Sequence, residues 1–136
     1  EIYCKTLKPI KKISTKEFPG YPTDLQAQLI ATQLKSGLKS KVVENIFENR
    51  FIHIPELRRF GANLSIKGNT VTIDKTSNLL GAEVMATDIR ASFSLIIAAM
   101  MSKGKTVINR IYHLDRGYED FDLKLKKCGV NISRKK

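Results

Sequence analysis

The feature that most constrains the fold is an internal repeat. Residues 23–27 (TDLQA) open an apolar stretch with helical periodicity, and residues 87–91 (TDIRA) open a second one 64 positions later (88 − 24 = 64). Further along each half, residues 61–65 (GANLS) are matched by residues 129–133 (GVNIS) at an offset of 68 (129 − 61 = 68). Two similar units at this spacing indicate a duplicated arrangement of secondary structure.

The elements expected in the two halves follow the same order. In the first half, the pattern predicts a helix over 23–35 capped by Thr23 or Asp24, a short strand over 41–46, a helix from Pro55 to Gly61, and a hairpin of 63–67 and 70–74. In the second half it predicts a helix from Thr87 to Gly104 and then segments over 106–109 (strand), 118–127 (helix) and 129–133 (strand). We therefore expect an α+β (α/β) fold of helices on mixed sheets, with one repeat in residues 1–75, including a leading segment, and a second in residues 76–136.

Composition excludes several classes of protein. The hydrophobic fraction of 42% and charged fraction of 27% are those of a globular chain. The longest apolar run, residues 95–101, is far shorter than the roughly 20 residues of a membrane span, so no membrane association is expected. The opening EIYCK is not a signal peptide and predicts a cut inside a longer chain. Cys4 and Cys128 form neither a metal-ligand pair nor a disulfide framework, which favours the cytoplasm.

The net charge of +11 raises the question of nucleic-acid binding. The basic residues are mainly scattered lysines, and no stripe interleaves them with aromatic residues. A solvated lysine-rich surface is therefore favoured over nucleic-acid binding. The same charge would help to attract an anionic small substrate.

Candidate functional residues lie where helices begin. Asp24 follows the rigid loop FPGYP, where it is either a helix cap or a carboxylate that accepts a proton or holds a substrate hydroxyl, and Asp88 has the same two interpretations. Three arginines occupy helix-entry loops and point to an anionic ligand: Arg50, Arg90 and Arg116. His53 and His113 have no metal-ligand spacing and are expected to be structural, and neither cysteine has the surroundings of a nucleophile.

Five motifs carry a family resemblance: PGYPTDLQAQ (19–28), FENRF (47–51), PELRR (55–59), MATDIRAS (85–92) and IYHLDRGYE (111–119). They resemble the enolpyruvyl transferase family, in its UDP-N-acetylglucosamine 1-carboxyvinyltransferase branch. The resemblance runs in order from Lys11 to Lys136 and corresponds to the C-terminal third of such enzymes. It implies an inside-out α/β barrel built from βαβαββ repeats, of which this chain would hold part of one domain.

The resemblance also implies a reaction. The 3′-hydroxyl of UDP-N-acetylglucosamine would attack C2 of phosphoenolpyruvate, and phosphate would leave from a tetrahedral intermediate. This is the first committed step of peptidoglycan synthesis, with consequences for cell-wall biogenesis, cell shape and cell division. The chemistry requires fixed cations and a carboxylate, and implies no metal and no organic cofactor.

Residue roles carry over by motif. Asp24 would be the base at the sugar hydroxyl, Arg116 would bind phosphoenolpyruvate, and Asp88 and Arg90 would lie near the reacting carbons. Sugar-nucleotide contacts would come from the main chain at Ile46, with Phe47 beside it, and from the cleft arginine Arg50.

The chain also departs from the family pattern. Glu17 replaces a usual proline, and Phe93 is bulkier than the usual alanine. The family's loop cysteine, the general acid, and its phosphate-binding lysine and second arginine lie in sequence absent here. The partner implied is therefore the N-terminal portion of the same enzyme, and the fragment alone is expected to be inactive and to expose the apolar face of residues 95–101.

Two alternatives remain. One is the related 3-phosphoshikimate enolpyruvyl transferase, which the ENRF and HLDRGYE strings disfavour. The other, from a different class, is a basic, non-catalytic RNA-binding module, whose binding would show a steep dependence on salt.

Overall fold

A computed structural model describes residues 7–135 of the chain. Its larger sheet has four strands in the order β1-β2-β4-β3, namely β1 (Lys12–Ser14), β2 (Ser40–Val43), β4 (Thr70–Ile73) and β3 (Leu64–Lys67). β1 pairs with β2 in parallel, and β4 runs antiparallel to both β2 and β3. The predicted hairpin is therefore confirmed, with its turn at Gly68 in the left-handed region (φ 56°).

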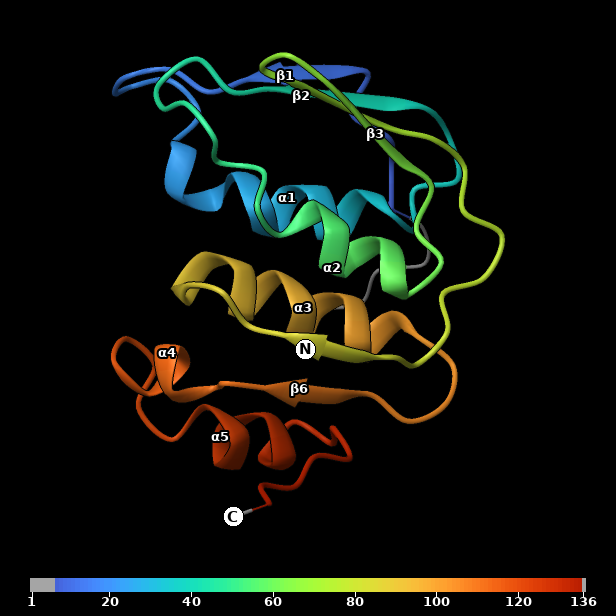
Figure 1. The fold of residues 1–136 in the computed structure, drawn as a ribbon, viewed down its shortest axis with the longest axis vertical. Coiled ribbons are helices and arrows are strands. Elements are labelled where there is room, and N and C mark those ends of the chain that lie inside the picture. Colours follow the sequence, from blue (N-terminus) through green and yellow to red (C-terminus); the bar gives the residue numbers. More distant parts are fainter. Residues whose placement is uncertain (1–6, 136) are drawn as a thin grey trace.

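A layer of helices packs on one face of this sheet (Figure 1). A 3₁₀ turn, η1 (Thr23–Leu25), leads into α1 (Gln26–Gln33), and α2 (Ile54–Arg59) and α3 (Ile89–Met101) lie beside it. The helices bury apolar side chains in one core with the sheet, among them Ile30, Leu57, Phe60, Val71 and Leu95.

A second, smaller sheet covers the other side of α3 (Figure 1). Its strands β5 (Glu83–Met85) and β6 (Val107–Asn109) pair in parallel, and α4 (Tyr112–Asp115) and α5 (Phe121–Lys127) follow. A second apolar cluster joins α3 to these last helices through Ile96, Leu114 and Phe121. α1, α2 and α3 lie between the two sheets, the arrangement expected of an inside-out fold, whereas α5 lies beyond β6 (Figure 1). Both sheets are open within residues 7–135.

Two expectations about the second half are wrong. Residues 129–133 form no strand, because Gly129 (φ 90°) ends α5 and the chain then turns back so that Ile132 packs against the cluster around Phe121. The run 95–101 is not an exposed apolar face, because α3 lies between layers: Leu95 and Ala98 are fully buried, and only Met100 is largely exposed. The bulky Phe93 side chain stacks on the ring of Tyr118, with ring centroids 4.7 Å apart.

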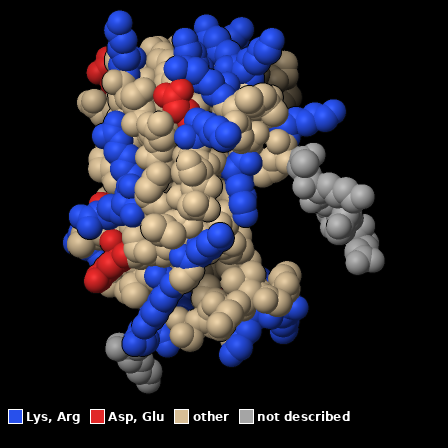
Figure 2. Space-filling model, turned by 90° about the vertical axis from the view of Figure 1, so that its right-hand side faces the viewer, with Lys and Arg blue, Asp and Glu red and all other residues tan. Residues whose placement is uncertain are grey.

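The surface carries the positive charge. Figure 2 shows lysine and arginine side chains spread across one face, densest at its upper end, with few acidic side chains among them. None of the helices described is long and apolar enough to cross a bilayer.

Candidate functional site

Asp24 lies in the 3₁₀ turn η1, directly after the loop that the prolines stiffen. It caps neither η1 nor α1, whose N-cap positions are Pro22 and Leu25 and make no side-chain hydrogen bond. Its side chain is 70% exposed. Of the two interpretations of Asp24 from the sequence, helix capping is wrong. The other, a carboxylate that accepts a proton or holds a substrate hydroxyl, stays a prediction.

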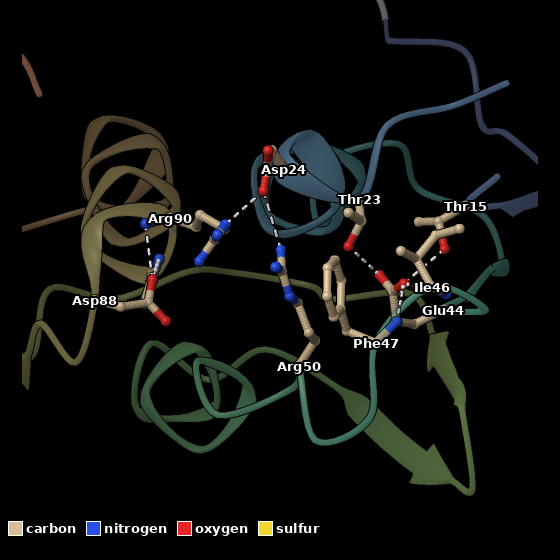
Figure 3. A network of polar contacts seen from close by, with 10 residues as sticks. Thr15, Thr23, Asp24, Glu44, Ile46, Phe47, Arg50, Asp88 and Arg90 are labelled. Carbon is tan, nitrogen blue, oxygen red and sulfur yellow. Dashed lines mark hydrogen bonds and ion pairs between the residues drawn. The ribbon is translucent and has the colours of Figure 1, made fainter. Parts of the chain in front are cut away.

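Two arginines from distant segments meet this carboxylate (Figure 3). Arg50 Nη1 lies 3.1 Å from Asp24 Oδ1, and Arg90 Nε lies 2.8 Å from the same oxygen. Arg50 comes from the loop after β2 and Arg90 from the first turn of α3, so the two halves of the chain each supply one cation. Both contacts are made by Oδ1, which leaves Oδ2 outside these two ion pairs.

The charges of this cluster shift the titration of Asp24. Its hydrogen bonds to Arg90 and then to Arg50 hold the pKa of the carboxyl below its ordinary value, against a smaller opposing effect of burial. Asp24 is therefore ionised throughout the neutral range. The Oδ2 oxygen can accept a hydrogen bond from a hydroxyl, and the guanidinium groups can bind a phosphate or carboxylate.

Local structure fixes Arg50 in place. Its guanidinium lies 4.1 Å from the ring centroid of Phe47, and its side chain is only 17% exposed. The preceding residue, Asn49, adopts φ 54°, a left-handed conformation that asparagine tolerates better than most residues. This turn brings Arg50 back toward Asp24.

Asp88 does what Asp24 does not. It caps α3, with its Oδ1 accepting hydrogen bonds from the backbone N–H groups of Arg90 and Ala91, each at 2.8 Å. Through this cap it fixes the helix turn from which Arg90 reaches Asp24. Its predicted place near the reacting carbons stays a prediction.

Glu44 is the site residue that sequence reasoning missed. It directly follows β2, is 3% exposed, and accepts hydrogen bonds from Thr15, Thr23 and the backbone N–H groups of Ile46 and Phe47. An acidic residue directly after the apolar pair Val42-Val43 of a strand was the available signal. The two residues expected to contact the sugar nucleotide are thus held by a buried carboxylate.

Arg116 makes no ion pair with the residues of the Asp24 cluster. It is exposed, in the turn between α4 and α5, and it takes part in none of the ion pairs found within residues 7–135. The neighbouring Gly117 packs so closely against Ile89, beside Asp88 and Arg90, that a side chain there would collide with it. Arg134 holds the other side of this turn through ion pairs to Asp115 and Asp122.

The histidine and cysteine candidates form no catalytic or metal site among residues 7–135. His53 is 2% exposed, and burial lowers its pKa to about 4. Cys128 is exposed and unpaired in the described structure, and Cys4 lies outside the described residues. Residues 7–135 bring together no group of three potential metal ligands among His, Cys, Asp and Glu.

Comparison with known proteins gives a consistent picture. A family model described as EPSP synthase (3-phosphoshikimate 1-carboxyvinyltransferase) matches residues 3–125. Proteins named UDP-N-acetylglucosamine 1-carboxyvinyltransferase are similar: that of Rhodopseudomonas palustris strain TIE-1 is 57% identical over 122 residues, and that of Pelagibacter ubique strain HTCC1062 is 54% identical over 136 residues. These matches cover 90% and 98% of this chain but 28% and 33% of the relatives, so the chain spans about a third of their length.

A solved structure agrees. The enolpyruvyl transferase NikO from Streptomyces tendae superposes with a TM-score of 0.85 at 28% identity, over 96% of this chain and 30% of that one. Because the family model covers most of the chain and the fold matches an enzyme of the same kind, this chain belongs to the EPSP synthase (3-phosphoshikimate 1-carboxyvinyltransferase) family of enolpyruvyl transferases.

Proposed function

We propose that this chain is the part of a cytoplasmic enolpyruvyl transferase that moves the enolpyruvyl group of phosphoenolpyruvate to the 3′-hydroxyl of UDP-N-acetylglucosamine, with release of phosphate. The observation that carries the proposal is the ionised Asp24 carboxylate between Arg50 and Arg90, at the meeting point of the two repeats. Similarity to relatives named for this reaction supports the choice of acceptor. In a cell, the reaction would begin peptidoglycan synthesis and so serve cell-wall growth, cell shape and division.

The proposal gives each group a role. Asp24 takes the proton of the attacking hydroxyl as its oxygen bonds to C2 of phosphoenolpyruvate, while C3 gains a proton from an acid that belongs to the rest of the enzyme. Loss of phosphate from the tetrahedral adduct, with return of a proton from C3, completes the transfer. Arg50, Arg90 and Arg116 stabilise the phosphate and carboxylate charges, and the main chain at Ile46 and Phe47 orients the sugar nucleotide.

Binding of an anionic substrate would also raise the pKa of Asp24. Both guanidinium groups lower the pKa of Asp24 when no substrate is present, which makes it a weak proton acceptor. An anionic substrate that draws either arginine to itself removes part of this effect. The pKa of Asp24 then rises toward its ordinary value as the reacting groups assemble, and Asp24 becomes the stronger base that the attack requires.

The test is a hybrid enzyme: the Rhodopseudomonas palustris relative with its matching 122 residues replaced by those of this chain. We expect the hybrid to fold and to release phosphate from phosphoenolpyruvate when UDP-N-acetylglucosamine is the acceptor, and not when shikimate 3-phosphate is. Preference for shikimate 3-phosphate would favour the alternative branch of the family. A hybrid that fails to fold, or that folds and transfers to neither acceptor, would overturn the proposal.

A further inference from the structure

The carboxylate of Glu44 is buried without a cation among the described residues. Its Oε1 accepts hydrogen bonds from Thr15 Oγ1 (2.8 Å), Ile46 N (2.8 Å) and Phe47 N (3.2 Å), and its Oε2 accepts one from Thr23 Oγ1 (2.8 Å). All four donors are neutral. Burial raises the pKa of Glu44, but these hydrogen bonds outweigh burial and hold the pKa below its ordinary value, so the group stays ionised in its cavity.

The four donors come from three separate parts of the chain (Figure 3). Thr15 follows β1, Thr23 begins the turn η1, and Ile46 and Phe47 lie in the loop after β2. Glu44 thus connects the residue adjacent to Asp24 with the loop that carries Phe47 and, three residues later, Arg50. These are the two sides of the site described above.

We infer that Glu44 is a positioning residue, which fixes the distance between the Asp24 turn and the Ile46–Phe47 loop so that the sugar nucleotide is held in line with its base. This inference rests on the proposed function. A charged acceptor suits the task, because hydrogen bonds to an ionised group are roughly twice as strong as neutral ones and hold backbone groups more tightly. A displacement of about 1 Å between a substrate and its base can cost on the order of 100-fold in rate.

The test compares three substitutions in the hybrid enzyme. Thr23→Val removes one hydroxyl from Glu44 at nearly constant volume, Thr23→Ser keeps it, and Glu44→Gln removes the charge but keeps the shape. We expect Thr23→Val and Glu44→Gln to lower kcat roughly tenfold or more and to raise KM for the sugar nucleotide several-fold, with KM for phosphoenolpyruvate within about twofold. Thr23→Ser should restore most of the activity.

Thr32→Val is the matched control, since Thr32 lies in the same helical segment and donates its hydroxyl to the backbone of Gln28 at 2.7 Å. If Glu44 is only structural, the control and Thr23→Val should change kinetics in proportion to their melting temperatures, and the inference falls.

Amide hydrogen exchange gives a readout independent of turnover. We expect exchange at Ile46 and Phe47 to quicken about tenfold in Glu44→Gln and to stay unchanged in Thr32→Val. Equal exchange in all variants would overturn the inference even in an active enzyme, whereas an inactive parent hybrid with the expected exchange pattern would instead count against the proposed function alone.

Discussion

Asp24 and Asp88 occupy the same position of the same motif and have different roles. Asp88 has extended backbone angles (φ −154°, ψ 178°), which turn its side chain back onto the free N–H groups of α3. Asp24 lies inside a 3₁₀ turn that follows Pro22, so its side chain points away from the helix and toward Arg50 and Arg90. Asp88 therefore stabilises the start of a helix, whereas Asp24 forms ion pairs with Arg50 and Arg90.

Asp24→Asn in the hybrid enzyme tests this assignment. The amide oxygen can still accept hydrogen bonds from the arginines, but the side chain can no longer take a proton. We expect turnover to fall by roughly two to four orders of magnitude, as is common when a general base is lost, with KM for the sugar nucleotide within a few-fold. Steady-state phosphate release measures both. Turnover within a few-fold of the parent would show that Asp24 is not the base.

Arg116→Lys tests the proposed contact with phosphoenolpyruvate. Lysine keeps the charge but cannot offer the planar pair of donors that suits a phosphate or carboxylate. We expect KM for phosphoenolpyruvate to rise about tenfold or more and KM for the sugar nucleotide to change little. Arg110→Lys is a suitable control, because Arg110 is an exposed arginine of a nearby loop with no assigned role. Equal weakening of both substrates by Arg116→Lys would indicate a folding defect instead.

His53 gives a prediction about acid stability. Burial lowers its pKa from 6.5 to about 4, although the charge of Asp88 and a hydrogen bond with the backbone of Arg50 oppose the shift. Between these values the unfolded chain binds a proton that the folded chain does not. Stability is therefore complete above about pH 6.5 and falls toward pH 4, by up to about 3 kcal/mol.

His53→Asn should flatten this dependence, because asparagine does not titrate and its amide can replace the ring Nδ1–H as a donor. Urea unfolding of the hybrid enzyme at pH 7.0 and 4.8 measures the difference. Asp24 and Glu44, whose pKa values are lowered in the folded protein, lose their contribution to the free energy of unfolding at lower pH. Both are present in the parent and in the His53→Asn variant, so they do not affect the comparison. An equal loss of stability in the parent and in His53→Asn would contradict the assignment.

At the scale of elements, the sequence predicts the helices and strands that are set by apolar periodicity and by turn residues. The helices α1, α2 and α3, the hairpin and β6 lie where their patterns place them, because apolar spacing and glycine stops act locally. β1 and β5 were not predicted, since each exists through pairing with β2 or β6 rather than through a pattern of its own. The Glu44 network is equally non-local, because its donors come from positions 15, 23, 46 and 47.

Gly81 lies just before β5 and packs against the backbone of Lys105, just before β6. A Cβ atom on Gly81 would collide with backbone atoms of Lys105, just before β5 pairs with β6. Gly81→Ala should therefore destabilise the protein by about 2 kcal/mol or more, because the backbone must shift. Gly117→Ala is the comparison, since its Cβ meets only the flexible end of Ile89 and should cost much less. Urea unfolding of both hybrids decides, and equal losses would contradict the packing described for Gly81.

At the scale of the whole molecule, the excess positive charge and the exposure of Asp24 both affect how an anionic substrate would reach the proposed site. A net charge of +11 raises the local concentration of anionic substrates around the chain. The binding surface around Asp24 is not enclosed, as the 70% exposure of this carboxylate shows. Water therefore has access to the Asp24 carboxylate and to the two guanidinium groups beside it.

The last prediction is that the 136-residue polypeptide alone catalyses nothing. Asp24, Arg50 and Arg90 are assembled within it, but Arg116 makes no ion pair within residues 7–135, and the proposed mechanism takes the proton for C3 from an acid in the rest of the enzyme. Relatives with this reaction in their names are about three times as long, which is consistent with a site completed by other segments. An open site also leaves water at the reacting atoms, where it weakens every electrostatic contact.

Phosphate release from both substrates measures the outcome. The polypeptide alone should give no release above background, and addition of the remaining two thirds of the Rhodopseudomonas palustris relative should restore it. The matched control is the Asp24→Asn polypeptide with the same supplement, which should restore almost nothing. Release by the unsupplemented polypeptide would show that all catalytic groups lie within these residues. Because the supplement supplies the acid and the missing phosphate contacts while Asp24 comes only from this chain, rescue by the parent and not by Asp24→Asn would locate the base on this third of the enzyme.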